Sequence, residues 1–158
     1  MHWADHTAMR LSKQYGSQVI ASGITPSGEF HIGHLREILT AEMIHRACLD
    51  AEIDSEYIFI VDSMDPLRRV YGFLSEEYQE YIGYPLVNIP APNPDGTPNH
   101  EGGNYANHFL QPFLEALKEI GVHPKVVMNH ETYDSGDFAT KIDLAIQNKD
   151  KIHEIINH

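Results

Sequence analysis

The chain has 158 residues, 42% of them hydrophobic, which is enough for one compact domain with its own core. A single cysteine, Cys48, excludes a disulfide framework and indicates a structural thiol in a reducing compartment. The formal charge of −12 disfavours a polyanionic partner unless basic residues gather on one face, and the absence of a long apolar run or signal peptide predicts a cytoplasmic protein without membrane contact.

The first third of the chain has the pattern helix, strand, glycine loop, helix. Residues 2–16 predict a helix, and residues 18–24 (QVIASGI) predict a buried strand. The Pro/Gly loop 25–34 follows. Apolar residues then recur at helical spacing, which predicts a long helix from about Gly33 to near Asp50.

The middle of the chain is less regular. Residues 57–62 (YIFIVD) predict a second short strand that ends in an acid. Residues 75–83 predict a helix with Ser75 as its N-cap and Gly83 at its end. Residues 84–103 are rich in proline, glycine and asparagine without periodicity, and predict a long inserted loop of functional or mobile character.

The last third again alternates helix and strand. Residues 104–121 predict a helix, 122–130 a third strand, and 137–158 one or two further helices. Strands that alternate with helices indicate the α/β class, with a Rossmann-like, doubly wound parallel sheet covered on both faces. Because ligands of such sheets bind at the carboxyl ends of the strands, we expect the chemistry in the loops after Ile24 and Val61.

The string SGITPSGEFHIGHLRE is the strongest signal in the chain. Gly23 and Gly28 remove side chains where the backbone turns or approaches a ligand, and Pro26 stiffens the turn. The spacing of His31 and His34 places both imidazoles near one helix N-terminus. Free N–H groups and the helix dipole favour phosphate at that position.

Two readings of the histidine pair follow from the residues alone. In the first, fixed donors stabilise charge on the α-phosphate of a nucleotide during adenylate formation, and Gly33 lets adenine or ribose lie against the backbone. In the second, the pair is a chance pair of surface or metal-binding histidines. The order of strand, TPSG turn, HIGH and amphipathic helix favours the nucleotide site.

At this point the sequence resembles a known family. HIGH near the first strand is the signature of class I aminoacyl-tRNA synthetases, and the longer string resembles the class I lysyl-tRNA synthetases in particular. Further similar segments are HWAD at 2–5, VDSMDPLRRV at 61–70, the YxxYIGYPL stretch at 78–86, NYANHF at 104–109 and NKDKIHEII at 148–156. The resemblance covers essentially all 158 residues and implies the N-terminal half of a HUP-type synthetase catalytic domain.

The resemblance implies a reaction and its substrates. The family activates L-lysine with ATP and Mg²⁺ to lysyl-adenylate and transfers the lysyl group to tRNA(Lys). Catalysis would then depend on His31 and His34. The ATP-binding residues implied by the family pattern are Pro26, Ser27, Gly28, His31, Gly33 and His34.

Lysine would be held at the ends of the first two strands. The family uses the GIT segment for lysine, which here points to Gly23 and Thr25. Asp62 and Asp65 follow the second strand, where carboxylates can hold a substrate ammonium group. An alternative remains open, in which Asp65 only caps a turn and Asp62 only ends the strand.

Two arginines follow these acids in the sequence. Arg68 and Arg69 could reach phosphate or tRNA. An exposed ion pair is the equally simple alternative, and the sequence does not choose between them.

Many members of the family hold zinc through an aspartate, a cysteine and two histidines. His100 and His108 match the histidines, but Asn99 stands at the cysteine position and Ala91 at the aspartate position. Asp95 is the nearest replacement for the aspartate. Zinc needs three or four ligands, so we expect that this chain has lost the metal.

The second family signature, KMSKS, and a helical anticodon-binding region do not occur in these residues. We therefore expect a fragment that is not fully active alone and whose partner is a missing C-terminal portion of the synthetase. Two alternatives remain. One is a small nucleotidyltransferase with an HxGH motif, although its late SSTxxR-like motif is absent. The other is a non-catalytic fragment or paralogue that binds lysine or tRNA.

Overall fold

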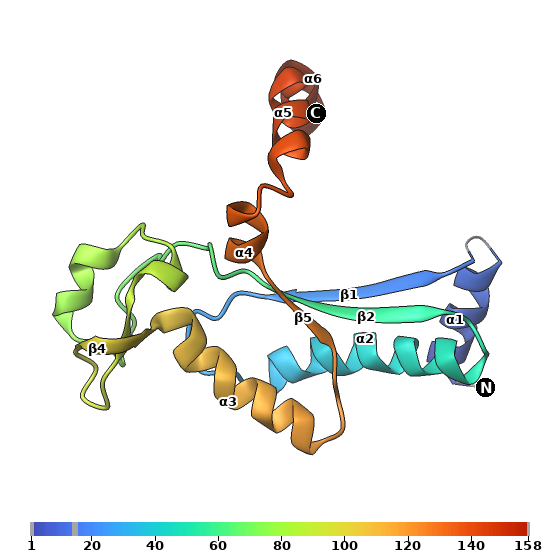
Figure 1. Ribbon diagram of the computed structural model, residues 1–158, viewed down its shortest axis with the longest axis horizontal. Coiled ribbons are helices and arrows are strands. Elements are labelled where there is room, and N and C mark those ends of the chain that lie inside the picture. The colour runs from blue at the N-terminus through green and yellow to red at the C-terminus, as the bar shows by residue number, and fades with distance from the viewer. Residues whose placement is uncertain (1, 14–15, 158) are drawn as a thin grey trace.

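The computed structural model describes residues 2–13 and 16–157, which are built around a three-stranded parallel sheet (Figure 1). The strands β1 (Gln18–Ile24), β2 (Ser55–Val61) and β5 (Lys125–Met128) lie in the order β1-β2-β5. β1 and β2 are in register from their first to their last residue, and β5 pairs with the carboxyl half of β2. The predicted α/β class with a Rossmann-like parallel sheet is confirmed.

Two helices in the first third of the chain follow the sequence prediction closely. α1 (Trp3–Ser12) ends before the predicted boundary, and residues 14 and 15 of that prediction lie outside the described residues. α2 (Ile32–Asp50) begins one residue before the predicted start. The two helices pack through four buried small side chains, Ala4, Ala8, Ala47 and Cys48. Cys48 is thus the buried structural residue expected from the sequence, and burial raises the pKa of its thiol.

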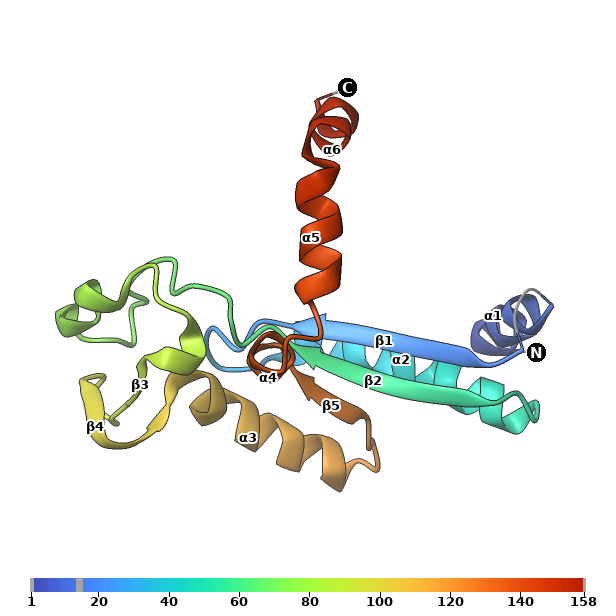
Figure 2. The same cartoon turned by 45° about the horizontal axis from the view of Figure 1, so that its top comes forward.

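α2 and α3 (Tyr105–Glu119) lie on the same face of the sheet (Figures 1 and 2). Along β1 every second residue is buried, because alternate side chains of a strand point to opposite faces. The buried residues of both strands meet the apolar sides of the two helices. This core comprises Ile20, Ile24, Ile38, Ala41, Tyr57, Phe59, Val61, Leu110, Phe113, Leu117 and Val122.

The opposite face of the sheet is open over the described residues. On this face of β1, Val19 is 65% exposed and Ala21 is also exposed. The short helix α4 (Asn129–Asp134), which the sequence did not predict, directly follows β5. α5 (Ala139–Gln147) and α6 (Lys149–Ile156) project away from the sheet, with their residues exposed (Figures 1 and 2). The expected helical cover is therefore present on one face only, because the terminal helices lack contacts that would hold them against the other.

No helix within residues 2–13 and 16–157 is long and apolar enough to cross a membrane. The longest helix, α2, carries charged side chains along its length and packs on the sheet.

The segment between β2 and α3 corrects two predictions. Residues 76–81 form a 3-10 helix, η1 (Glu76–Tyr81), and the Ser75 side chain makes no capping hydrogen bond. Its hydroxyl is buried without a partner. Gly83 has a φ of +89°, as a residue that ends a helical turn often does. The position of this element was predicted correctly, but its type was not. The buried Tyr78 side chain holds the turn through contacts with residues outside it, and the local sequence does not show such contacts.

The predicted irregular loop 84–103 is instead a short 3-10 turn, η2 (Leu86–Asn88), and an antiparallel hairpin. The hairpin strands are β3 (Pro90–Pro92) and β4 (Pro98–Asn104). The Tyr78 hydroxyl donates to the Pro90 carbonyl at 2.9 Å. Prolines at its strand ends hide the strand signal in the sequence, while tertiary hydrogen bonds and a second apolar cluster hold the hairpin. That cluster contains Leu67, Leu74, Tyr78, Leu86, Ile89, Tyr105, Ala106 and Phe109.

Candidate active site

The loop between β1 and α2 lies at the carboxyl end of the sheet, where the sequence predicted the chemistry. Pro26 is fully buried, and the Tyr105 hydroxyl donates to the Ser27 carbonyl at 2.8 Å. A Cβ added at Gly28 would lie 3.4 Å from the ring of Phe73. The loop is therefore fixed from α3 and from the segment between β2 and α3, and it presents the start of α2 in one orientation.

The two histidines of the HIGH motif cap the helix that follows them. The His31 Nδ1 accepts the Gly33 N–H at 3.1 Å, and the His34 Nδ1 accepts the His31 N–H at 3.0 Å. Their rings stack with centroids 3.9 Å apart. A nitrogen that accepts a hydrogen bond carries no proton, so each neutral ring holds its proton on Nε2. Capping thus leaves two N–H donors that the helix itself does not use.

Burial and the neighbouring His31 lower the pKa of His34, partly offset by Glu37. His34 is therefore neutral at neutral pH, and the stacked pair does not require two adjacent positive charges. Neutral Nε2–H groups at a helix N-terminus are suited to donate hydrogen bonds to an anionic phosphate.

Gly33 has a steric role in this arrangement. A Cβ at this position would lie 2.8 Å from the His31 Cε1 and 2.9 Å from its Nδ1. Real Cβ atoms do not approach this closely, so any other residue would displace the His31 ring from its cap. The glycine in the HIGH motif is explained by the fold of the motif itself, in addition to its expected role of admitting a ligand.

The structure brings the predicted lysine-binding residues together. The Thr25 hydroxyl donates to the Asp65 carboxylate at 2.6 Å, across the ends of β1 and β2. The Asn129 amide donates to the Asp62 carboxylate at 2.6 Å. A Cβ on Gly23 would lie 3.8 Å from the same carboxylate. The two acids also lie in a turn, as the alternative interpretation of the sequence expected, because the Asp65 N–H donates to the Asp62 carbonyl at 3.2 Å.

A third carboxylate joins these acids from α2. The Gly23 N–H donates to Glu37 at 3.1 Å, on the side of β1 that has no neighbouring strand among the described residues. Burial raises the pKa of Asp62, and Asp65 and Glu37 raise it further, against the hydrogen bond from Asn129. The three acids therefore form one negatively charged region.

Sequence reasoning missed both Glu37 and Asn129. Glu37 stands in the quoted motif string, one turn after His34, and that spacing could have shown it on the same side of the helix. Asn129 directly follows β5 at the same edge as Asp62, so the rule used for the first two strands applied to it as well. His130 also belongs to this edge, because its Nδ1 lies 2.8 Å from the buried hydroxyl of Ser63.

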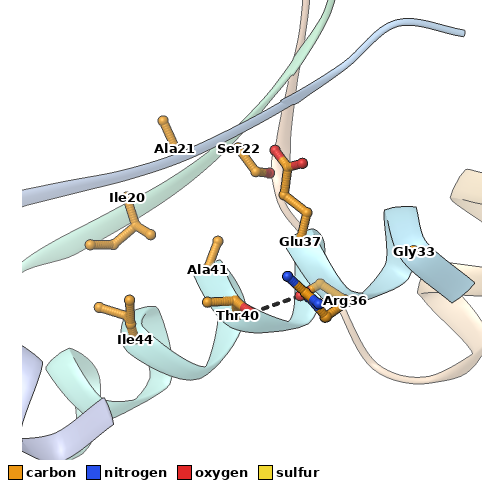
Figure 3. A pocket seen from close by; sticks show the side chains of 9 residues that line it. All are labelled: Ile20, Ala21, Ser22, Gly33, Arg36, Glu37, Thr40, Ala41 and Ile44. Atoms are coloured by element: carbon orange, nitrogen blue, oxygen red, sulfur yellow. Dashed lines mark hydrogen bonds between the residues drawn. The ribbon is translucent and has the colours of Figure 1, made fainter. Parts of the chain in front are cut away.

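Two hollows flank the start of α2. The first, here called the β1 groove, has a volume of about 610 Å³ and lies between β1 and α2 (Figure 3). The Glu37 side chain points from α2 toward Ser22 of β1 in this groove. The residues that line it are Ile20, Ala21, Ser22, Gly33, Arg36, Glu37, Thr40, Ala41 and Ile44.

The second hollow, here called the histidine pocket, has a volume of about 570 Å³. It gathers most of the residues that the sequence assigned to ATP, together with Thr25. Its lining comprises Thr25, Ser27, Gly28, Glu29, His31, His34, Tyr71, Phe73, Pro92, Asn93, Pro94, His108 and Phe109. The predicted site residues thus divide between two adjacent hollows that share the first turn of α2.

The residues named for zinc do not form a metal site. The Asp95 carboxylate accepts the Thr97 N–H and hydroxyl at 3.0 and 2.7 Å, inside the turn between β3 and β4. Ala91 and Asn99 face each other in the hairpin register, but a methyl group and an amide do not replace an aspartate and a cysteine. In the chain as described, no three His, Cys, Asp or Glu residues are placed to hold a metal ion. His100, His108 and Asp95 are therefore not assembled around zinc.

Comparison with known proteins gives one consistent result. The family model "tRNA synthetases class I (K)" matches residues 1–158. The chain is 43% identical over 156 residues to a lysine–tRNA ligase of Methanosarcina barkeri, and 45% identical over 156 residues to one of Archaeoglobus fulgidus. Each match covers 99% of this chain but only 28% and 30% of the relative. A lysine–tRNA ligase of Methanocaldococcus jannaschii is 43% identical over 161 residues, with 29% of its length covered.

Proposed function

The chain belongs to the class I (K) family of tRNA synthetases, and on that premise we propose that it forms the lysine-binding and ATP-binding part of a lysine–tRNA ligase. It spans about 28 to 30% of the length of the curated relatives given above. We therefore assign to these residues the binding of lysine and ATP, and not the complete reaction of the longer relatives.

The observation that supports this function best is the placement of three carboxylates beside two histidine N–H groups that can donate hydrogen bonds to phosphate. Glu37, Asp62 and Asp65 surround the ends of β1 and β2. Within the described residues their only ion pair is a long one, from Arg68 to Asp65 at 3.7 Å. Lysine carries two ammonium groups. A site with excess negative charge fits such a substrate, and an ammonium group close to Asp62 would favour the ionised form of this carboxylate, whose pKa is raised.

ATP would approach the same edge from α2. The Nε2–H groups of His31 and His34 are placed to donate to phosphate oxygens, and the first turn of α2 adds its free N–H groups. Mg²⁺ would enter with ATP as part of that substrate. Gly33 opens onto the β1 groove, which has room for the nucleoside.

In the reaction we propose, a lysine carboxylate oxygen attacks the α-phosphorus of ATP. A bond from that oxygen to phosphorus forms, and the bond from phosphorus to the pyrophosphate oxygen breaks. Negative charge grows on the phosphate oxygens as this happens, and fixed donors stabilise it more than they stabilise the ground state. Transfer then follows when a tRNA hydroxyl attacks the lysyl carbonyl and AMP leaves. The side chains of this chain position and stabilise, and none becomes covalently modified.

The acidic edge also separates this function from the alternative of a small HxGH nucleotidyltransferase. Such an enzyme transfers AMP to a phosphate-bearing molecule, and that acceptor phosphate gives the three neighbouring carboxylates no positive charge to pair with. The relatives named above are all lysine–tRNA ligases, and this similarity supports the same choice.

Equilibrium binding to the 158-residue chain tests the proposal directly. Lysine and norleucine differ only in the terminal ammonium group, so calorimetry with each ligand isolates its contribution. We expect lysine to bind at least about tenfold more tightly, since a paired charge of this kind contributes about 1.5 kcal/mol or more. Equal affinities would refute the lysine site.

Pyrophosphate exchange into ATP, tested with each amino acid, separates catalysis from binding. Exchange with lysine alone would show that these residues complete adenylate formation. Selective lysine binding without exchange would limit the chain to substrate binding. AMP transfer to a phosphate-bearing acceptor would refute the ligase function.

A further inference from the structure

The ends of β2 and β5 are joined by side chains beyond the last backbone pair of the two strands. That pair is Val61 and Met128. The next residue after each strand is polar, and the Asn129 amide donates to the Asp62 Oδ1 at 2.6 Å. Because the two strands are parallel and in register, the residues that follow them leave the sheet at the same edge, which places these side chains next to each other.

A second contact, one residue further along, anchors this junction. Ser63 is fully buried, and its hydroxyl accepts the His130 N–H at 3.2 Å. The His130 Nδ1 lies 2.8 Å from the same hydroxyl. The start of α4, which follows β5 directly, is therefore fixed to the end of β2 (Figure 1). Asn129 is held in place by this anchor and does not depend on its own bond to Asp62 for its position.

The hydrogen bond from Asn129 sets the orientation of the Asp62 carboxylate. The Asp62 N–H donates to the Ile24 carbonyl at 3.1 Å, which fixes its backbone at the end of β1. The Oδ1 atom accepts from Asn129, and the Oδ2 atom lies toward β1, 3.8 Å from the position that a Cβ on Gly23 would take. Gly23 places no side chain over this second oxygen. One carboxylate oxygen thus serves the anchor on β5, while the other faces the strand end where we place lysine.

The charged groups around Asp62 oppose its ionisation. Glu37 faces it from α2, Asp65 faces it from the turn after β2, and Arg68 lies 3.7 Å from Asp65. Burial raises the pKa of Asp62, the two acids raise it further, and the hydrogen bond from Asn129 lowers it. A donor that points at a carboxylate favours the ionised form. Asn129 therefore counteracts the burial and the repulsion that would otherwise neutralise Asp62.

We propose that Asn129 is a positioning residue for lysine, which holds the Asp62 carboxylate ionised and turns its Oδ2 toward Gly23 to meet an ammonium group of the amino acid. This inference rests on the proposed function, which supplies lysine as the ligand of these acids. It extends the lysine site to the end of a third strand, β5. Lysine recognition then depends on a neutral amide that acts through Asp62.

Calorimetry with lysine between about pH 5 and pH 8 tests this role on the 158-residue chain. Lysine affinity should fall as the pH drops through the folded pKa of Asp62, because protonation removes the charge that pairs with the ammonium group. In Asn129→Ala this fall should begin about one pH unit higher, since a hydrogen bond to the ionised form is lost. Identical pH profiles in the two proteins would overturn the proposal.

Further variants separate positioning from a general structural role. Asn129→Leu keeps a side chain of similar size without the donor, and should shift the pH profile as Asn129→Ala does. Asn148→Ala is the matched control, because the Asn148 amide donates to the Leu144 carbonyl at 2.8 Å on α5. It should leave the profile unchanged. The Kd for ATP should change by less than about twofold in both Asn129 variants. Equal weakening of lysine and ATP binding at every pH would show that Asn129 only supports the fold.

NMR of the Asp62 carboxyl carbon separates this inference from the proposed function. The resonance is assigned by its absence in Asp62→Asn, and its titration gives the pKa of Asp62 without any ligand. We expect this pKa to be higher in Asn129→Ala and Asn129→Leu than in the unaltered chain. If lysine binds no better than norleucine while this difference is present, the action of Asn129 on Asp62 stands and the proposed lysine site fails. If lysine is preferred but the titration of Asp62 does not move, the lysine site stands and the role of Asn129 fails.

Discussion

The two ends of α2 use similar residues for opposite purposes. At its N-terminal end, His31 and His34 cap the helix through Nδ1, and both side chains line the histidine pocket. At its C-terminal end, the His45 Nδ1 lies 2.9 Å from the Ser55 hydroxyl. Cys48, near the same end, is fully buried against α1. A histidine becomes a candidate functional group here because of the cavity beside it, and not because of its position in an amphipathic helix.

The same comparison applies to charge. Carboxylates gather at the N-terminal end of α2, where burial and the neighbouring acids raise the pKa of Asp62. No lysine or arginine in the described residues neutralises them at close range. On the C-terminal half of the helix, Glu42 forms a 2.6 Å ion pair with Arg46. One end thus retains unbalanced charge that a cationic substrate could neutralise, and the other balances its charge internally.

The largest effect that would test this difference between the two ends of α2 is on adenylate formation. We expect His31→Ala or His34→Ala to lower lysine-dependent pyrophosphate exchange by about 10²-fold or more, in an enzyme complete enough to catalyse it, because each removes a donor aimed at developing charge. His45→Ala is the control, a histidine of the same helix that should have little effect. Unchanged exchange in both HIGH variants would remove the distinction between the two ends.

At the other end we expect a large effect on stability alone. Ala8 is fully buried between α1 and α2, so Ala8→Leu should lower the free energy of unfolding by about 1 to 3 kcal/mol through overpacking. Urea denaturation measures this. Met9→Leu, at a neighbouring residue that is 44% exposed, should change stability little. If Ala8→Leu altered lysine affinity in the folded protein, the two ends would not be independent.

A smaller effect is expected on lysine binding. Thr25→Val removes the hydroxyl that donates to Asp65 at 2.6 Å and leaves that carboxylate less well oriented. We expect the Kd for lysine to rise about tenfold, the loss of one charge-assisted hydrogen bond, with little change in the Kd for ATP. Calorimetry of the variant with lysine and with ATP measures both Kd values. A greater effect on ATP would show that Thr25 belongs to the phosphate side of the site.

The smallest effect concerns the pH dependence of stability. Burial, Asp65 and Glu37 raise the pKa of Asp62 above 3.8 in the folded chain. A raised pKa means that Asp62 contributes stability below pH 3.8 and that this contribution is lost as the pH rises through its folded pKa. Asp62→Asn should therefore melt at a higher temperature than the unaltered chain at pH 7. The corresponding gain in the free energy of unfolding should be less than about 1 kcal/mol after solvent screening.

Thermal melts between pH 3.5 and pH 7 are the measurement. The difference in melting temperature between Asp62→Asn and the unaltered chain should grow with pH and should be absent at the acid end of this range. A variant that is less stable at pH 7 would show that Asp62 is stabilised as a carboxylate in the free chain, contrary to the direction given by its surroundings.

Prediction from the sequence worked best where the signal was local. The strand at 18–24 has the predicted bounds, and α2 begins one residue from its predicted start, because alternating burial and helical spacing are written into neighbouring residues. Prediction failed for the hairpin at 90–104, whose prolines give no strand signal and whose hydrogen bonds depend on Tyr78 and other distant groups. The turn that the Asp95 carboxylate closes with Thr97 was likewise not predicted.

The residues of the candidate site likewise divide into those that a local pattern shows and those that depend on tertiary contacts. The HIGH histidines were found from their spacing, since capping acts over three residues. Glu37 reaches a partner 14 residues away and Asn129 reaches one 67 residues away, so no local pattern shows either contact. The position of Tyr71 and Phe73 beside the histidines likewise depends on how the segment between β2 and α3 folds back over the β1–α2 loop.

The sequence by itself determined the parallel α/β class, the histidine cap of α2 and the resemblance to a synthetase family, because each depends on residues that are close together in the chain. Only the tertiary structure decided that three carboxylates meet at one strand edge, that one face of the sheet stays open in the described residues, and that HIGH separates two hollows. Those properties arise from packing between elements. Packing depends on the shape and distance of side chains that the order of residues does not reveal.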